Sequence, residues 1–283
     1  MADGRGPNDH AVWGARSHRF FDGLQPTLNI AHRGGACLYP ENTVLAFDHA
    51  VRSHGAHMIE TDVHLTADGE VVVIHDDRLE RTTNGTGEVA QWTWAELAKL
   101  DAGYYFQRLD EADYVYRDQN LRIPRLSDVL AQFPNQTFNI DLKANNPELV
   151  TSFVQVIRRH DASHRVCVGS EHDAIGQRLL EALPDAIHFF PRAALIECMT
   201  ALMGNEPLNE AWLYRVVDVP LTYAGIQLVT PHILERAESA GLWVNVWTID
   251  DEPTMMHLLE LKVGGIMTDR PDRLNALLKA AVS

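Results

Sequence analysis

Short apolar runs alternate with longer amphipathic stretches along most of the chain, and this alternation predicts the secondary structure. Brief apolar runs bounded by turn residues are typical of buried strands, whereas apolar residues that recur every three or four positions are typical of helices. The predicted strands are Leu28–Ala31, His57–His64, Val71–His75, Phe138–Leu142, Arg165–Gly169, Ala186–Phe190, Leu213–Val217, Gly225–Val229, Leu242–Trp247 and Gly265–Thr268. The predicted helices are Thr43–His54, Thr93–Leu100, Leu126–Phe133, Pro147–His160, Asp173–Leu183, Pro231–Ala240, Glu252–Leu261 and Asp272–Ala280.

Residues before three of these helices match known helix-start signals. Asn42 precedes Thr43, Asn146 precedes Pro147, and Thr230 precedes Pro231. Asn and Thr side chains cap free backbone N–H groups, and proline fits the first helical turn. Repeated strand–helix units of this length predict a parallel sheet covered by helices.

The placement of polar residues favours a closed barrel over an open dinucleotide-binding sheet. The segment after the first strand, His32-Arg33-Gly34-Gly35-Ala36, does not fit the GxGxxG pattern of such a sheet. Polar residues instead end several different strands, as with His32, Lys143 and Asp269. Catalytic groups gathered from many strand ends are typical of the TIM (β/α)8 barrel, which is the predicted fold class. We expect an N-terminal polar segment over residues 1–27, one barrel domain over 28–283, and an insertion at about 101–122.

The stretch from Ile59 to Asp77 predicts one antiparallel hairpin within this barrel. The pair Asp68-Gly69 suits a two-residue turn between two strands. With that turn central, Asp62 falls opposite His75, and Glu60 lies diagonally on the same face. The hairpin therefore predicts an imidazole beside two carboxylates.

Composition narrows the class of partner. The formal charge is −15, from 24 basic and 39 acidic residues, which argues against a nucleic-acid partner or an anionic membrane surface. No segment approaches the roughly 18 consecutive apolar residues of a membrane span, so no stable membrane insertion is expected. The three cysteines, Cys37, Cys167 and Cys198, are widely spaced and predict neither a disulfide framework nor a zinc site. We therefore expect a cytoplasmic protein with a small-molecule substrate, and the oligomeric state stays open.

Three carboxylates inside otherwise apolar strands predict a metal site. Glu60 and Asp62 point to the same side of one strand, and Asp141 comes from another strand. Oxygen ligands without cysteine suit Mg²⁺ or Ca²⁺, and Mn²⁺ is a further candidate. The alternative is that these are solvated acids at strand ends, which is weaker for three acids than for one.

Two histidines and two cations complete the candidate chemistry. His32 and His75 are suited to acid and base roles because the imidazole titrates near neutral pH, although a lone histidine is more often structural. Arg33 and Lys143 are typical phosphate partners, with salt bridging to nearby acids as the alternative. A cation, two basic side chains and two imidazoles together match phosphodiester cleavage. Trp247 ends a strand and forms either an apolar wall for the substrate or a cap on the core.

Most of these residues lie in segments that resemble the glycerophosphodiester phosphodiesterase family. The segments are AHRGGACLYPENTVLAF, IETDVHLTADGEVVVIHDDRLERTTNGTG, VPLTYAGIQLVTPHILERAESAGLWVNVWTID and GGIMTDRPD. The resemblance implies a TIM barrel with a small insertion, a divalent cation, and hydrolysis of glycerophosphodiesters to glycerol 3-phosphate and an alcohol. It also implies roles for the site residues: His32 and His75 as the acid/base pair, Glu60 and Asp62 as metal ligands, Arg33 and Lys143 on the phosphate, and Trp247 against the glycerol or leaving group.

One departure and one insertion bear on the substrate and the metal. The family pattern NxExK reads Asn139-Ile140-Asp141-Leu142-Lys143 here, and Asp reaches about one methylene less than Glu, so direct coordination by Asp141 stays open. The insertion carries Tyr104, Tyr105, Phe106, Tyr114 and Tyr116, which either cover an acyl chain or pack the insertion onto the barrel. The alternatives to the main function are lysophospholipase D-type cleavage and a non-catalytic barrel that binds phosphodiesters.

Overall fold

The computed structural model describes residues 18–108, 113–205, 207 and 212–282. Of the predicted N-terminal segment, residues 1–17 lie outside the described part, as do residues 109–112 of the predicted insertion. Within the described residues, no helix is long and apolar enough to cross a membrane.

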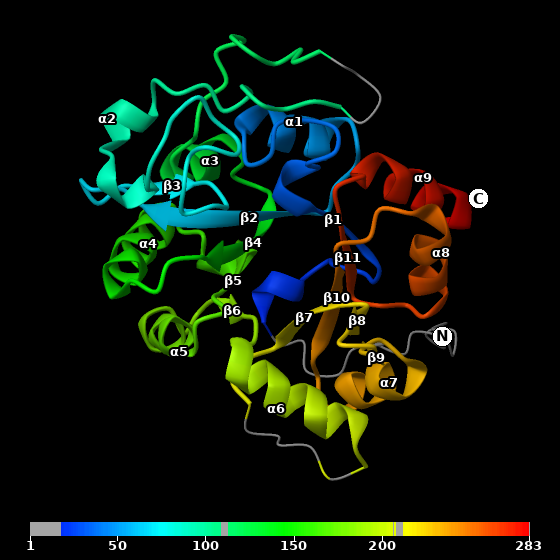
Figure 1. The fold of residues 1–283 in the computed structure, drawn as a ribbon. Coiled ribbons are helices and arrows are strands. Elements are labelled where there is room, and N and C mark those ends of the chain that lie inside the picture. Colours follow the sequence, from blue (N-terminus) through cyan, green and yellow to red (C-terminus); the bar gives the residue numbers. More distant parts are fainter. Residues whose placement is uncertain (1–17, 109–112, 206, 208–211, 283) are drawn as a thin grey trace, which may run out of the picture.

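The fold is a TIM (β/α)8-type barrel, as predicted, and Figure 1 shows its strands surrounded by helices. The parallel strands follow one another in the order β6-β5-β4-β2-β1-β11-β10-β7, and a parallel bridge between Phe189 and Val216 joins the two ends of this order. The barrel strands are β1 Leu28–Ala31, β2 Met58–Leu65, β4 Thr137–Leu142, β5 Val166–Gly169, β6 Ile187–His188, β7 Val216–Pro220, β10 Trp243–Trp247 and β11 Gly265–Thr268. The helices are α1 Val44–Arg52, α2 Trp94–Leu97, α3 Leu126–Gln132, α4 Pro147–Arg159, α5 Asp173–Ala182, α6 Arg192–Met203, α7 Pro231–Ser239, α8 Glu252–Glu260 and α9 Pro271–Val282.

Helix α4 illustrates how the sequence specifies these elements. Asn146 accepts a hydrogen bond from the Glu148 N–H, and Pro147 occupies the first turn, as predicted. The side chains of Leu149, Phe153 and Ile157 recur at four-residue intervals and are fully buried. Burial of such a side chain contributes about 1.5–3 kcal/mol, so one face of the helix is fixed against the sheet. The start of α1 differs from expectation, because Thr43 rather than the residue before it accepts the capping hydrogen bond.

The predicted antiparallel strand exists, but its register differs from the prediction by one residue. Strand β3 (Val71–Val73) pairs with β2, and beyond these strands the Thr66 N–H donates to the Glu70 carbonyl, so three residues rather than two make the turn. Gly69 takes a left-handed φ of +83° in this turn. The Ile74 N–H consequently donates to the Asp62 carbonyl, so Ile74 and not His75 lies opposite Asp62. His75 leaves the strand and still reaches the same cavity as Asp62.

Two further predictions about the C-terminal half were wrong. The segment Gly225–Val229 is not a barrel strand; it contributes β9 (Ile226–Gln227), which pairs with β8 (Thr222–Tyr223) in a small hairpin outside the barrel. The predicted strand Leu213–Val217 begins later, at Val216. Helix α6 was not predicted at all, because its apolar residues are not confined to one face.

Candidate active site

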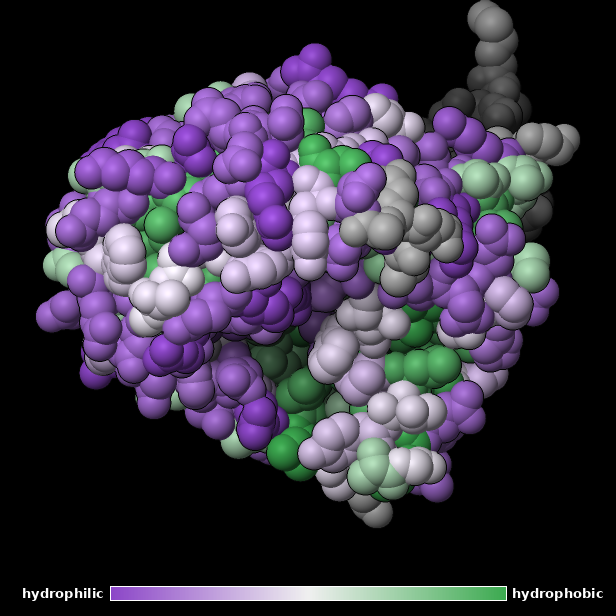
Figure 2. Space-filling model, turned by 45° about the horizontal axis from the view of Figure 1, so that its top comes forward, coloured by the Kyte–Doolittle hydropathy of each residue, from purple (hydrophilic) through white to green (hydrophobic). Residues whose placement is uncertain are grey.

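All eight residues predicted for the site line one cavity. The cavity has a volume of about 700 Å³ and opens where the barrel strands end. Figure 2 shows a hollow with hydrophobic side chains on its lower wall, beneath a largely hydrophilic surface. The eight residues are His32, Arg33, Glu60, Asp62, His75, Asp141, Lys143 and Trp247. The sequence therefore identified residues that the fold brings together.

The turn after β1 places Arg33 between the acidic residues of the cavity. This turn is a short 3-10 helix, η2 (His32–Gly34), in which Arg33 has a left-handed φ of 51°. The Arg33 backbone N–H donates to Glu60 Oε2 at 3.1 Å, and its guanidinium donates to Glu41 Oε1 at 2.9 Å. Gly34 follows at φ +86°, where a Cβ atom would come within 2.8 Å of the Ala46 Cβ. The close packing of this turn on α1 therefore requires glycine.

Strand β2 holds Glu60 and Asp62 in very different electrostatic surroundings. Asp62 is 1% exposed, and burial opposes its ionisation, but Lys143 and Arg33 outweigh burial and lower its pKa. Its Oδ1 lies 2.9 Å from Lys143 Nζ, and its Oδ2 accepts from Asn42 Nδ2 at 3.0 Å. Burial and the nearby charge of Asp62 instead raise the pKa of Glu60 to about 8. Glu60 is thus a buried carboxyl group whose ionisation needs additional positive charge nearby.

Asp141 and Lys143 end β4 on the same side of the cavity. Lys143 Nζ lies 2.7 Å from Asp141 Oδ2, while the buried Asp141 Oδ1 has no hydrogen-bond partner. Burial raises the pKa of Asp141, although the Lys143 charge partly offsets this. The oxygen donors and their excess negative charge fit a hard divalent cation at Glu60 and Asp62, with Asp141 Oδ1 as a further donor. Lys143 forms salt bridges with both Asp62 and Asp141, which is the alternative to phosphate binding considered above. Its role on the phosphate stays a prediction.

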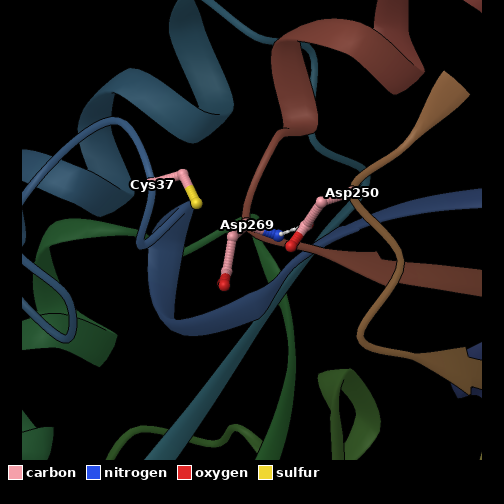
Figure 3. Close-up of side chains that lie close together, drawn as sticks. All are labelled: Cys37, Asp250 and Asp269. Carbon is pink, nitrogen blue, oxygen red and sulfur yellow. Dashed lines mark hydrogen bonds between the residues drawn. The ribbon is translucent and has the colours of Figure 1, made fainter. Parts of the chain in front are cut away.

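Among the described residues, one group of possible metal ligands is tightly clustered, and it does not include the predicted carboxylates Glu60, Asp62 and Asp141. That cluster consists of Cys37, Asp250 and Asp269, whose ligand atoms lie within 4.8 Å of one another. Cys37 and Asp250 approach Asp269 from opposite sides, and the Asp269 N–H donates to Asp250 (Figure 3). Burial, followed by the charges of the two aspartates, raises the pKa of the Cys37 thiol to about 11, which disfavours the thiolate that binds metals.

The contacts of Asp269 support a role in orienting the His32 ring. Asp269 Oδ1 lies 2.7 Å from His32 Nδ1. Because an ionised carboxylate can only accept, Nδ1 carries the proton and Nε2, 3.9 Å from Glu60 Oε2, is left to exchange protons. Burial opposes protonation of His32, but the hydrogen bond that His32 donates to Asp269 and the charge of Glu60 outweigh burial and raise the pKa of His32.

His75 has a corresponding carboxylate partner. Its Nδ1 lies 2.7 Å from Asp76 Oδ1, and Arg81 donates to both oxygens of Asp76. The hydrogen bonds from Arg81 lower the pKa of Asp76 to about 2, which keeps this acceptor ionised. Arg81 also donates to both oxygens of Glu41, so the two histidine-bearing segments share one ion-pair network.

Much of the remaining wall of the cavity is apolar, although Glu171, Arg192 and Asp218 also line it. Trp247, at the end of β10, is 43% exposed and lines the cavity, so it does not cap the core. The aromatic residues of the insertion pack elsewhere: the Arg117 guanidinium lies over the rings of Tyr104 and Tyr114, and Phe106 packs edge-on against Tyr116. None of the insertion's described aromatic residues lines this cavity, which supports the packing alternative for the insertion.

Sequence reasoning missed the partners that orient the predicted residues. Asp269 was singled out only as a polar strand end, although its place after a buried strand was the available signal. Asp76 and Arg81 lie in the family-like segment but received no role. Glu41 and Asn42 lie before α1, and nothing in the local pattern indicates that Glu41 pairs with two arginines or that Asn42 contacts β2.

Comparisons with known proteins show what the chain is similar to. The profile described as the Glycerophosphoryl diester phosphodiesterase family matches residues 32–273. A glycerophosphodiester phosphodiesterase of Caldanaerobacter subterraneus is 32% identical over 89% of this chain and 98% of its own. A lysophospholipase D of Homo sapiens is 29% identical over 88% of this chain and 85% of its own. A crystal structure of a glycerophosphodiester phosphodiesterase from Agrobacterium tumefaciens superposes with a TM-score of 0.72 and 27% identity, covering 88% of this chain and 99% of the other.

Proposed function

The chain belongs to the glycerophosphoryl diester phosphodiesterase family, and from this premise we propose that it hydrolyses glycerophosphodiesters to glycerol 3-phosphate and an alcohol. The observation that carries the proposal is the pair of carboxylate-oriented histidines, His32 and His75, in one cavity with buried acids and two basic side chains. A site that only binds a phosphodiester needs no such pair of proton carriers. The arrangement therefore favours an enzyme over a non-catalytic barrel.

The basic side chains and the acidic side chains have different roles in binding the phosphate. Arg33 and Lys143 face the cavity and supply hydrogen-bond donors to the phosphoryl oxygens. A divalent cation, Mg²⁺, Ca²⁺ or Mn²⁺, held by Glu60 and Asp62 with Asp141 as a further donor, would polarise these oxygens and offset the charge that develops on them. Lys143 and Arg33 already lower the pKa of Asp62, so one ligand is ionised before the cation binds.

The histidines move the protons. His32, with Nδ1 fixed by Asp269, takes the proton of the attacking glycerol hydroxyl at Nε2. His75, with Nδ1 fixed by Asp76, donates a proton to the oxygen of the departing alcohol. Water then opens the cyclic phosphate, with the two roles exchanged. Trp247 bounds the side of the cavity where the glycerol or leaving group lies.

The direct test is release of glycerol 3-phosphate from glycerophosphocholine and glycerophosphoethanolamine. The protein is first treated with a chelator, and Mg²⁺, Ca²⁺ or Mn²⁺ is then restored separately. We expect no release after chelation and recovery with at least one cation. Tight binding of either diester without turnover under all these conditions would instead favour the non-catalytic barrel.

A histidine variant tests the assignment of the proton carriers. His75→Ala is expected to lower kcat by about 10²–10⁴-fold, the usual contribution of a general acid, with the fold retained. His257→Ala, an exposed histidine on α8, is the matched control and is expected to keep full activity. Near-normal turnover by His75→Ala would show that His75 is not the acid.

A cytoplasmic setting is part of the same proposal. The three cysteines are free, and Cys167 and Cys198 are buried, which is consistent with a reducing compartment. Fractionation of the source cells would test it.

A further inference from the structure

We propose that α6 and the β8–β9 hairpin form a binding site for one hydrocarbon chain carried by the substrate, so that the enzyme accepts amphiphilic phosphodiesters of the lysophospholipid type. This inference rests on the proposed function, because it places the phosphodiester of the same molecule at the histidines. It assigns the chain to the side of the cavity opposite the predicted insertion.

The cavity has two chemically different sides. The proposed metal ligands, Arg33, Lys143 and both histidines come from β1 to β4 and the residues that follow these strands. The opposite side comes from β6 onwards, and most of its side chains are apolar, although Arg192 and Asp218 also line it. On that side, Leu195, Ile196, Met199 and Met203 of α6 and Tyr223 and Ile226 of the hairpin line the same cavity. In Figure 1, α6 and the hairpin lie in the lower half of the view, and the lower wall of the hollow in Figure 2 is hydrophobic. The apolar wall is therefore continuous with the reacting groups.

Much of this wall is open to solvent. Ile196 is 62% exposed, Met203 39%, Tyr223 70% and Ile226 52%. Single exposed apolar residues are common, but a group of them along a cavity marks a surface that is covered when a ligand binds. Methionine side chains adapt their shape to a flexible ligand, which suits a hydrocarbon chain of variable length.

A deacylated glycerophosphodiester does not account for this wall. Its glycerol and phosphate are polar, so they gain little from contact with isoleucine, methionine or leucine side chains. The cavity volume of about 700 Å³ is within the roughly 300–1,000 Å³ of pockets that enclose drug-sized ligands, larger than glycerol 3-phosphate requires. Most side chains that line the additional space are apolar, and a hydrocarbon chain is the group that contacts them favourably.

The occupant must also belong to the substrate. A protein segment placed on this wall would lie over the catalytic groups and exclude the phosphodiester, because both line the same cavity. A chain attached to the glycerol reaches the wall while its phosphate stays between Arg33 and Lys143. The chemistry is unchanged: the phosphorus–oxygen bond to the alcohol breaks, water supplies the hydroxyl and the proton, and the acylated glycerol phosphate is released with the alcohol.

The first experiment compares kcat/KM for glycerophosphocholine with that for lysophosphatidylcholines bearing hexanoyl to dodecanoyl chains. All are kept below their micelle-forming concentrations, with the activating cation present. A buried methylene contributes about fourfold to affinity, and this wall is partly open, so kcat/KM should rise about two- to fourfold for each added methylene.

Matched variants test whether the apolar wall of α6 causes the rise of kcat/KM with chain length. The double variant Ile196→Gln/Met203→Gln should reduce the ratio of kcat/KM for dodecanoyl to deacylated substrate by at least about tenfold. Met256→Gln changes a methionine of similar exposure, 47%, on α8 away from the cavity, and should leave the ratio unchanged. Equal losses in both variants would overturn the assignment to α6.

A binding measurement separates failure of this inference from failure of the proposed function. Dodecylphosphocholine, below its micelle-forming concentration, is titrated calorimetrically into the wild type and the double variant. Hydrolysis of glycerophosphocholine with no dependence on chain length and no dodecylphosphocholine binding would overturn the hydrocarbon site and leave the function standing. Dodecylphosphocholine binding that the double variant weakens, without hydrolysis of any substrate, would support the site and overturn the function.

Discussion

Replacing Asp269 with asparagine tests whether this carboxylate sets the protonation of His32. Asp269 Oδ1 lies 2.7 Å from His32 Nδ1, and its side chain is 20% exposed, so the contact is partly shielded from water. Asparagine has nearly the same shape but no charge. It can also turn its NH2 group towards Nδ1, which would move the imidazole proton to Nε2 and block the base.

The size of the effect has a lower and an upper bound. Loss of a hydrogen bond to a charged group costs about 1.5–3 kcal/mol, which corresponds to about 10- to 150-fold in rate. If the asparagine also fixes the wrong tautomer, the loss extends to about 10⁴-fold, as found for the corresponding change in a serine protease triad. We therefore expect kcat for Asp269→Asn to fall by between about 10-fold and 10⁴-fold.

The pH profile separates this effect from simple structural damage. A base must be neutral to accept a proton, so the rate falls as the pH drops through the pKa of His32. Asp269 raises that pKa through its hydrogen bond and its charge. Without the carboxylate the pKa falls, and the acidic limb of kcat/KM should move to lower pH.

The assay is glycerol 3-phosphate release across the acidic range, with thermal unfolding measured alongside. Asp272→Asn is the matched control, because Asp272 accepts hydrogen bonds from Arg270 and makes none with His32. Activity of Asp269→Asn within twofold of the wild type, or a large loss with an unmoved acidic limb, would refute the reasoning.

Two other predictions concern buried charge and pH. Lys143→Ala leaves the buried Asp62 and the partly buried Asp141 without their shared cation, so the metal-free variant should lose about 3 kcal/mol of unfolding free energy. Lys99→Ala, at an exposed residue in the turn after α2, should lose little, and equal denaturant midpoints for the two variants would contradict this. Burial lowers the pKa of His188, so below about pH 6.5 the unfolded chain gains a proton that the folded chain does not, and stability should fall as the pH drops from there towards the lowered pKa. The loss of stability between pH 7.5 and 5.5, measured by denaturant unfolding, should be smaller for His188→Gln than for the wild type, and an identical loss would exclude His188 as a contributor.

The barrel and most of its polar site were predictable because both depend on short-range pattern. Buried strands such as Phe138–Leu142 read as apolar runs, and the residues that follow such strands meet at one end of any parallel barrel. Glu60 and Asp62 share a face simply because they lie two apart on a strand. These inferences need no knowledge of which distant elements touch.

The features that the sequence did not reveal depend on contacts between distant segments or on exact loop geometry. The hairpin register changed by one residue because Gly69 allows a three-residue loop, a choice that the pair Asp68-Gly69 does not determine. Helix α6 carries apolar residues towards both the core and the cavity, so it lacks the single apolar face from which a helix is recognised. The pairing of Asp269 with His32 joins residues 237 positions apart, and no local pattern records it.

The division of the cavity between two parts of the chain has a consequence for how such enzymes diversify. Every proposed proton carrier, phosphate contact and metal ligand lies between His32 and Lys143, whereas the apolar wall begins only with β6. Insertions, deletions or recombination within the later segment can therefore remodel which molecules enter without displacing the reacting atoms. A chimaera that exchanges the region from α6 to β9 for that of a relative should inherit the donor's substrate preference while keeping its own chemical step.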